Sequence, residues 1–153
     1  MKVLDFLRPN AIVADLAATT KAAALAELST RMASLEPSLD AEELRRVLEE
    51  RELLASTAIG DGIAIPHGKL DAIGHLAGVL GRSRAGLDFD SIDGRPTHLL
   101  FMLVAPVSST GVHLKALARL SRLFRDPEFR ARLLAAPTGE AMYQVISDED
   151  AKY

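Results

Sequence analysis

The spacing of hydrophobic residues changes repeatedly along this chain and predicts alternating strands and helices. Residues 97–106, THLLFMLVAP, are almost all apolar and end in proline, which is typical of a strand covered on both faces. Shorter apolar runs predict strands over residues 10–16 and 75–83. The sheet of this protein should therefore contain a deeply buried central strand.

Between the predicted strands, apolar residues recur at helical spacing. Residues 19–35 predict a helix capped by Thr19 or Thr20, and residues 40–56 predict a second helix capped by Asp40. Three further helices are expected over residues 108–124, residues 126–136 with proline at the first helical position, and residues 138–147. The alternation indicates an α/β fold, a three-layer α/β/α sandwich with a mixed central sheet. We expect one domain over residues 1–153, because the sequence contains no repeat or linker.

Composition narrows the possible functions. The net charge is −3 with both signs mixed along the chain, and only 5% of residues are aromatic, which argues against nucleic-acid binding. The absence of cysteine excludes disulfides, thiol catalysis and cysteine-bound metal. No apolar stretch approaches the ~20 residues of a membrane span, and the N-terminus does not match a secretory signal, so we expect a cytoplasmic protein without membrane insertion.

The stretch GIAIPHGK is unusual for ordinary core packing. Its apolar residues 63–65 predict a buried strand that Pro66 ends, which would place His67 at the mouth of that strand. Gly68 lets another molecule approach closely, and Ser56 and Thr57 supply hydroxyls upstream as candidate phosphate-site support. A nucleophilic histidine requires one ring nitrogen to attack while a hydrogen bond holds the other, and this setting favours such a role.

Two other polar residues fall on apolar helix faces. Arg51 lies seven positions after Leu44, on the stripe that we expect to be buried. It either extends its charged end to solvent, pairs with a buried carboxylate, or binds an anion. His113 is in the first turn of its helix, four positions before Leu117, and is either a hydrogen-bonded core histidine or part of an anion site. The other residues that we assign to the predicted stripe around Arg51 are Val47, Leu48 and Leu54.

Two alternative sites are disfavoured. GIAIPHGKL resembles an ATP-binding loop, but five residues separate its glycines where that motif has four, and leucine follows the lysine. The four histidines do not show the spacing typical of zinc ligands. His75 and His98 lack the setting of His67, so we interpret both as structural or exposed, and we expect no metal and no cofactor.

The segments RELLASTAIGDGIAIPHGKL, GLDFDSIDGRPTHLLFMLVAP and HLKALARLSRLFRDPEFRARLL together resemble a known family. They are similar to the enzyme IIA domains of the bacterial phosphotransferase system, fructose/mannitol type, and closest to the nitrogen-regulatory branch. The resemblance implies that His67 carries a phosphoryl group as phosphohistidine, that His113 lies beside it, and that Arg51 helps to hold the phosphate. It also implies a histidine phosphocarrier protein as donor, itself charged from phosphoenolpyruvate by an enzyme I.

Three functional hypotheses follow. The first is a regulatory phosphocarrier with a nitrogen-related signalling role and an unidentified target protein, which we favour because the chain carries no transport domain. The second is a sugar-specific enzyme IIA that passes phosphate to an enzyme IIB of the fructose/mannitol type. The third is a binding module in which His67 is no longer phosphorylated; the combination of Arg51, His67 and His113 argues against it.

Overall fold

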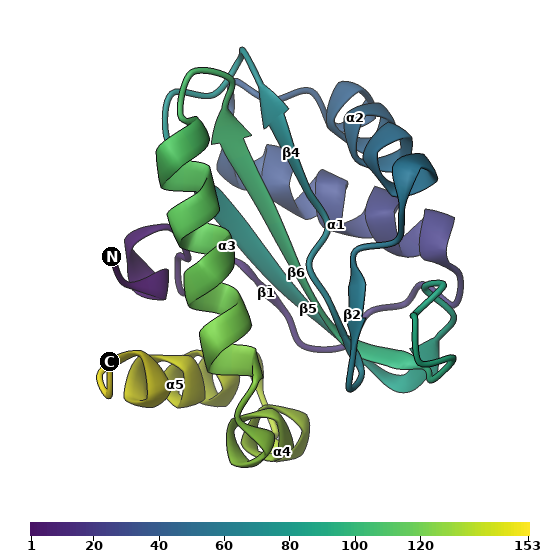
Figure 1. Ribbon diagram of the computed structural model, residues 1–153, viewed down its shortest axis with the longest axis vertical. Helices are drawn as coiled ribbons and strands as arrows, with labels where there is room; N and C mark the ends of the chain where they lie inside the picture. The colour runs from purple at the N-terminus through teal and green to yellow at the C-terminus, as the bar shows by residue number, and fades with distance from the viewer.

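A mixed sheet of six strands runs through the computed structural model, which describes residues 1–153 (Figure 1). The strand order is β1-β5-β6-β3-β2, and β4 pairs with β6 beyond the end of β3. The β5–β6 and β2–β3 pairs are antiparallel, whereas β1 runs parallel to β5, and β3 and β4 run parallel to β6. The strands are β1 (Ile12–Val13), β2 (Ala58–Gly60), β3 (Ile63–Ala64), β4 (His67–Leu70), β5 (Ala77–Leu87) and β6 (Thr97–Pro106).

Five α-helices and one short 3-10 helix surround the sheet. They are η1 (Val3–Asp5), α1 (Lys21–Leu35), α2 (Ala41–Leu54), α3 (Thr110–Phe124), α4 (Pro127–Ala135) and α5 (Gly139–Asp150). Thr20 caps α1 by accepting a hydrogen bond from the Ala23 N–H at 3.2 Å, and Asp40 caps α2 by accepting from the Glu43 N–H at 2.9 Å. These caps confirm the predicted starts of both helices.

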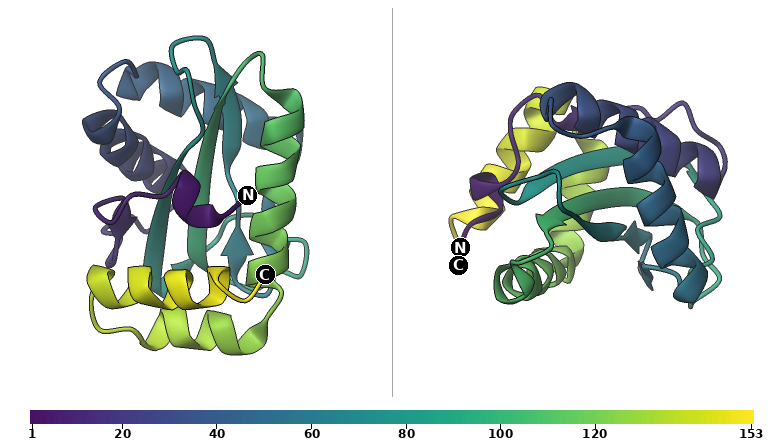
Figure 2. Two further views of the ribbon diagram at one scale, coloured as in Figure 1. Left: turned by 90° about the vertical axis from the view of Figure 1, so that its left-hand side faces the viewer. Right: turned by 90° about the horizontal axis from the view of Figure 1, so that it is seen from above.

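The helices lie on both faces of the sheet, which confirms the predicted α/β/α architecture. Figure 2 shows α1 and α2 on one face, α3 on the opposite face, and α4 and α5 packed together across one end. None of these helices combines the length and the apolar character that crossing a membrane requires. The layers place the N-terminal end of α3 and the C-terminal half of α2 on either side of β4 (Figure 1).

The central strand β6 is the best-predicted element of the fold. It spans the expected residues 97–106, and its residues 99–105 are all buried, with neighbours on both edges and helices on both faces. The two other predicted strands, over residues 10–16 and 75–83, do form strands, but with different bounds. The first strand is reduced to Ile12–Val13, and the strand expected over residues 75–83 runs instead from Ala77 to Leu87.

The predicted buried stripe of α2 was wrong at one position. Leu44 and Leu48 are buried as expected and Val47 is half-buried, but Leu54 is 82% exposed. The physical reason is that Leu54 faces an open cleft beside α2, where no other element packs against it.

The position of His67 also differs from the prediction. Residues 63–65 are buried as expected, but the strand covers only Ile63–Ala64, and Pro66 has no N–H to continue the ladder. The chain then returns to the edge of β6, so His67 begins a new strand, β4, opposite Leu103. His67 is therefore the first residue of β4, whereas the prediction placed it just after the end of the preceding strand. Only Ile65 and Pro66 separate β3 from β4, and such short strands leave too little periodicity to be recognised in the sequence.

Candidate functional site

A cleft of about 620 Å³ opens between α2, β4 and the start of α3. It brings together four of the six residues singled out from the sequence: Arg51 from α2, His67 and Gly68 from β4, and His113 from α3. The remaining lining residues are Val47, Glu50, Leu54, Lys69, Thr110, Leu114 and Leu117. The helix stripe, the strand start and the helix N-terminus noted in the sequence thus belong to one concave site.

The ring of His67 is oriented by the backbone carbonyl of Ile65, two residues earlier in the chain. Nδ1 lies 2.8 Å from the carbonyl oxygen of Ile65. Because a carbonyl oxygen only accepts hydrogen bonds, Nδ1 carries the proton and Nε2 keeps a free lone pair. The pKa of His67 is lowered from its ordinary value, mainly by burial, against the opposing effect of the Ile65 hydrogen bond. The imidazole is therefore neutral at pH 7, with Nε2 as its nucleophilic atom.

The second histidine lies beside the first and is more deeply buried. The ring centroids of His67 and His113 are 5.4 Å apart, with the planes at 77°. His113 is only 5% exposed, and its Nε2 has no hydrogen-bond partner. Burial, His67 and Lys69 lower the pKa of His113 to about 4, so this ring is also neutral at pH 7. An unpartnered buried ring nitrogen beside a cleft is a candidate contact for a ligand.

Two cations of the cleft have no carboxylate partner. The Arg51 guanidinium donates one hydrogen bond, from Nη1 to the Ala55 carbonyl oxygen at 2.9 Å, and forms no ion pair. Lys69 Nζ donates to Thr110 Oγ1 at 2.9 Å. Glu50 is the only acidic residue of the lining and forms no salt bridge with either. Free donors of Arg51 and Lys69 can therefore bind an anion in the cleft.

Lys69 is a site residue that the sequence analysis missed. Side chains two positions apart on a strand point to the same side, so Lys69 shares the side of His67. The two-residue spacing between His67 and Lys69 was present in the sequence, but it indicates a shared side only once a strand is known to begin at His67.

Ser56 and Thr57 do not line the cleft. The Ser56 hydroxyl donates to the Phe89 carbonyl oxygen at 2.6 Å, and the Thr57 hydroxyl donates to the carboxylate of Glu52. Thr57 is buried. Both hydroxyls therefore fix the segment between α2 and β2, away from the position that direct contact with a bound phosphate would require.

Gly68 is required by close packing between β4 and α2. A Cβ atom at this position would lie 3.1 Å from Val47 Cγ1 and 3.5 Å from Leu48 Cδ2. The missing side chain lets α2 approach the strand that carries His67, which brings Arg51 to the same cleft.

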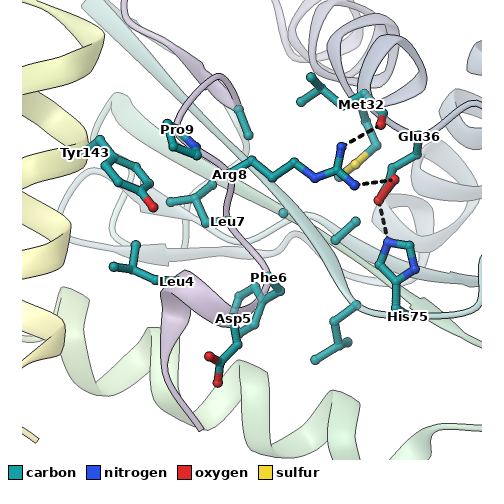
Figure 3. Close-up of a pocket in the computed structure, with 15 residues that line it drawn as sticks. Leu4, Asp5, Phe6, Leu7, Arg8, Pro9, Met32, Glu36, His75 and Tyr143 are labelled. Atoms are coloured by element: carbon teal, nitrogen blue, oxygen red, sulfur yellow. Dashed lines mark hydrogen bonds and ion pairs between the residues drawn. The ribbon is translucent and has the colours of Figure 1, made fainter.

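The other two histidines have structural contacts elsewhere. His75 Nε2 lies 2.5 Å from the Glu36 carboxylate, which also pairs with Arg8, in a separate cavity of about 280 Å³ (Figure 3). His98 Nδ1 lies 2.9 Å from the Ser83 carbonyl oxygen. These contacts agree with the structural interpretation of both residues.

Comparison with known proteins identifies the class to which this fold and cleft belong. Residues 5–149 match the family model of the phosphoenolpyruvate-dependent sugar phosphotransferase system, EIIA 2. The chain belongs to this family.

Individual relatives point to two branches of the family. A nitrogen regulatory protein of Bradyrhizobium diazoefficiens is 40% identical over 147 residues, which cover 96% of this chain and 95% of the relative. The fructose-specific EIIABC component of Bacillus subtilis is 35% identical over 98% of this chain, but the match covers only 24% of that protein. The crystal structure of the nitrogen regulatory protein IIA-Ntr from Neisseria meningitidis superposes with a TM-score of 0.87 at 31% identity, covering 93% of this chain and 97% of that one.

Proposed function

We propose that Nε2 of His67 accepts a phosphoryl group from the phosphohistidine of a histidine phosphocarrier protein. The observation that best supports this proposal is the hydrogen bond from Nδ1–H to the Ile65 carbonyl oxygen, which leaves Nε2 unprotonated. The same cleft contains two cations, Arg51 and Lys69, that have no carboxylate partner. As the new N–P bond forms, the N–P bond of the donor breaks and its electron pair returns to the donor imidazole. No proton has to leave Nε2, because that atom carries none.

The rest of the cleft supplies charge stabilisation, which is the main requirement of phosphoryl transfer. Arg51 and Lys69 lie where they can bind the oxygens of the transferring group. His113 is neutral, and a proton on its unpartnered Nε2 would be donated to a phosphoryl oxygen. The first N–H groups of α3 and its dipole favour negative charge at the same end of the cleft.

The output of the phosphorylated protein is proposed to be regulatory and nitrogen-related. This proposal is supported by relatives that this chain matches along nearly their whole length and that are nitrogen regulatory proteins. The alternative is a sugar-specific enzyme IIA that hands the phosphoryl group to an enzyme IIB. It is supported by the match to one segment of a fructose-specific component. Transfer from the phosphorylated protein to a purified fructose- or mannitol-type IIB domain separates the two roles: rapid transfer supports transport, and no transfer supports regulation.

The phosphoryl acceptor is tested with labelled phosphoenolpyruvate, enzyme I and the histidine phosphocarrier protein. We expect the wild type to be labelled and His67→Ala to remain unlabelled with an unchanged circular dichroism spectrum. The label should be lost in acid and retained in base, as a phosphoramidate requires. Label on His67→Ala, or an acid-stable label, would overturn the assignment, and a wild type that never accepts label would favour a binding module.

A further inference from the structure

Glu52 is a buried carboxylate next to the site that does not line the cleft. It follows Arg51 in α2 and is only 7% exposed. Its Oε1 accepts the Thr57 N–H at 3.0 Å, and its Oε2 accepts the Thr57 hydroxyl. Lys21 of α1 pairs with the same carboxylate at 3.1 Å, which compensates the buried charge. All the hydrogen bonds that Glu52 accepts in this way converge on the backbone and side chain of one residue, Thr57.

Thr57 is connected to His67 by two further hydrogen bonds. The Thr57 carbonyl oxygen accepts the N–H of Ile65 at 3.0 Å. The Ile65 carbonyl oxygen then accepts the Nδ1–H of His67 at 2.8 Å. Ile65 thus connects the two residues: its N–H donates to Thr57, and its carbonyl oxygen accepts from the His67 imidazole. The Ile65 carbonyl oxygen selects the His67 tautomer. Its orientation depends on the position of Thr57, which is fixed by the hydrogen bonds to Glu52.

We propose that Glu52 is a positioning residue that, through Thr57 and Ile65, fixes the ring orientation and tautomer of His67 so that Nε2 is presented for phosphoryl transfer. This proposal rests on the function proposed above for His67. Glu52 touches neither the phosphoryl group nor the reacting nitrogen, and its effect is carried by three consecutive hydrogen-bonded contacts.

The chemistry of the residue explains why a carboxylate occupies this position. Thr57 offers two donors, its N–H and its hydroxyl, and both oxygens of Glu52 accept from it. Glutamine keeps an acceptor for the N–H and can donate to the threonine oxygen, so it preserves the geometry and removes the charge. Alanine leaves both Thr57 donors buried and unpaired, which frees the Ile65 segment to move.

The test compares Glu52→Ala and Glu52→Gln with the control Glu36→Ala. Glu36 is also a buried carboxylate paired with a cation, but its side chain contacts Arg8 and His75, and neither residue is a hydrogen-bond partner of Thr57 or of the His67 ring. The measurements are the unfolding midpoint in urea, the nitrogen-15 NMR shifts of the His67 ring in the unphosphorylated protein, and the single-turnover rate of phosphorylation by the phosphocarrier.

We expect Glu52→Ala to convert His67 from a single Nδ1–H tautomer to a mixture and to slow phosphorylation by about 10- to 100-fold, because displacement of a reacting group by ~1 Å costs up to about 10²-fold. Glu52→Gln should restore the single tautomer and a rate close to that of the wild type. Glu36→Ala should lose stability while keeping the wild-type tautomer and rate.

The proposal is overturned if Glu52→Ala is less stable but retains both the tautomer and the rate, since Glu52 would then serve stability alone. If Glu52→Ala does not fold, Thr57→Val and Thr57→Ser replace it: the valine variant should show the tautomer mixture, and a wild-type spectrum in both would overturn the proposal. The NMR measurement uses no phosphoryl donor. A wild type that accepts no phosphate therefore refutes the proposed function without affecting the test of ring positioning.

Discussion

The rings of His67 and His113 lie edge to face, with centroids 5.4 Å apart, although one belongs to β4 and the other to α3. A proton on either ring opposes a proton on the other, and His67 contributes to the lowered pKa of His113. Because both rings are neutral near pH 7, Nε2 of His67 has a free lone pair and no proton has to be removed from it. The same arrangement makes the fold sensitive to acid.

We predict that His113 makes the protein less stable as the pH falls below about 6.5. Its pKa is about 4 in the folded protein, against an ordinary value near 6.5 when unfolded. Between these values the unfolded chain binds a proton that the folded protein does not, so the free energy of unfolding decreases as the pH falls, by of order 1–3 kcal/mol down to pH 4.5. Above pH 7 this group contributes no pH dependence.

Urea unfolding of the wild type and His113→Asn at pH 7, 6 and 5 measures this effect. Carboxylates titrate in both proteins, so the difference between their slopes isolates His113. Parallel slopes from pH 7 to pH 5 would show that the histidine titrates normally in the folded protein.

The second prediction concerns Arg51, which we propose to bind the phosphoryl group. Arg51→Ala should slow phosphorylation of His67 by about 10²–10³-fold, the usual cost of removing one preorganised donor from a charge-stabilising site. Its stability should change little, because the single hydrogen bond of Arg51 lies at an exposed helix end. Arg46→Ala on the same helix is the matched control, since Arg46 is exposed and does not line the cleft. Rapid-quench transfer assays should separate the two variants; equal rates would remove Arg51 from the site.

How far the sequence predicts this fold depends on the length of each periodic segment. Residues 97–106 and the capped helices were recognisable because one pattern persists over ten or more residues. The strand ends at a proline, and each helix begins at an N-cap residue. β2 and β3 are only three and two residues long, and the turn between them consists of Asp61 and Gly62, both with positive φ. Such short strands are defined by pairing with β6 or with each other, which no local pattern records.

The site was predictable in part for a similar reason. Arg51, His67 and His113 stood out because each polar side chain contradicts its local pattern. Glu52 did not stand out, because a glutamate in a charged helix is unremarkable until its burial against Thr57 is known. The hydroxyls of Ser56 and Thr57 were near the correct place in sequence, but their direction depends on Phe89 and Glu52, which come from other parts of the fold.

The third prediction tests the packing of β4 against α2. Gly68→Ala places a methyl group 3.1 Å from Val47 Cγ1, so α2 must move away from β4. We expect a loss of about 1–3 kcal/mol in the free energy of unfolding and slower phosphorylation, because Arg51 moves with the helix. Gly74→Ala is the control, since a Cβ at that glycine has no neighbour within 4 Å.

The double variant Val47→Ala/Gly68→Ala removes the atom that is contacted. It should recover part of both losses, so that the two substitutions are not additive. Strict additivity in urea unfolding would show that the contact with Val47 is not the cause.

The last prediction separates docking of the donor protein from the chemistry at His67. Leu54 and Leu114 line the cleft and are 82% and 62% exposed, which is unusual for leucines beside charged groups. A donor protein must cover this rim to bring its phosphohistidine to Nε2, whereas a small donor such as phosphoramidate need not. We therefore expect Leu54→Ser/Leu114→Ser to raise the donor-protein concentration needed for half-maximal rate by about 10-fold or more. Labelling by phosphoramidate should stay at the wild-type rate. Ile92→Ser, at an equally exposed residue outside the cleft, should alter neither reaction. If the double variant slows both donors equally, the leucines support the site itself; if it slows neither, the phosphocarrier approaches His67 over a different surface.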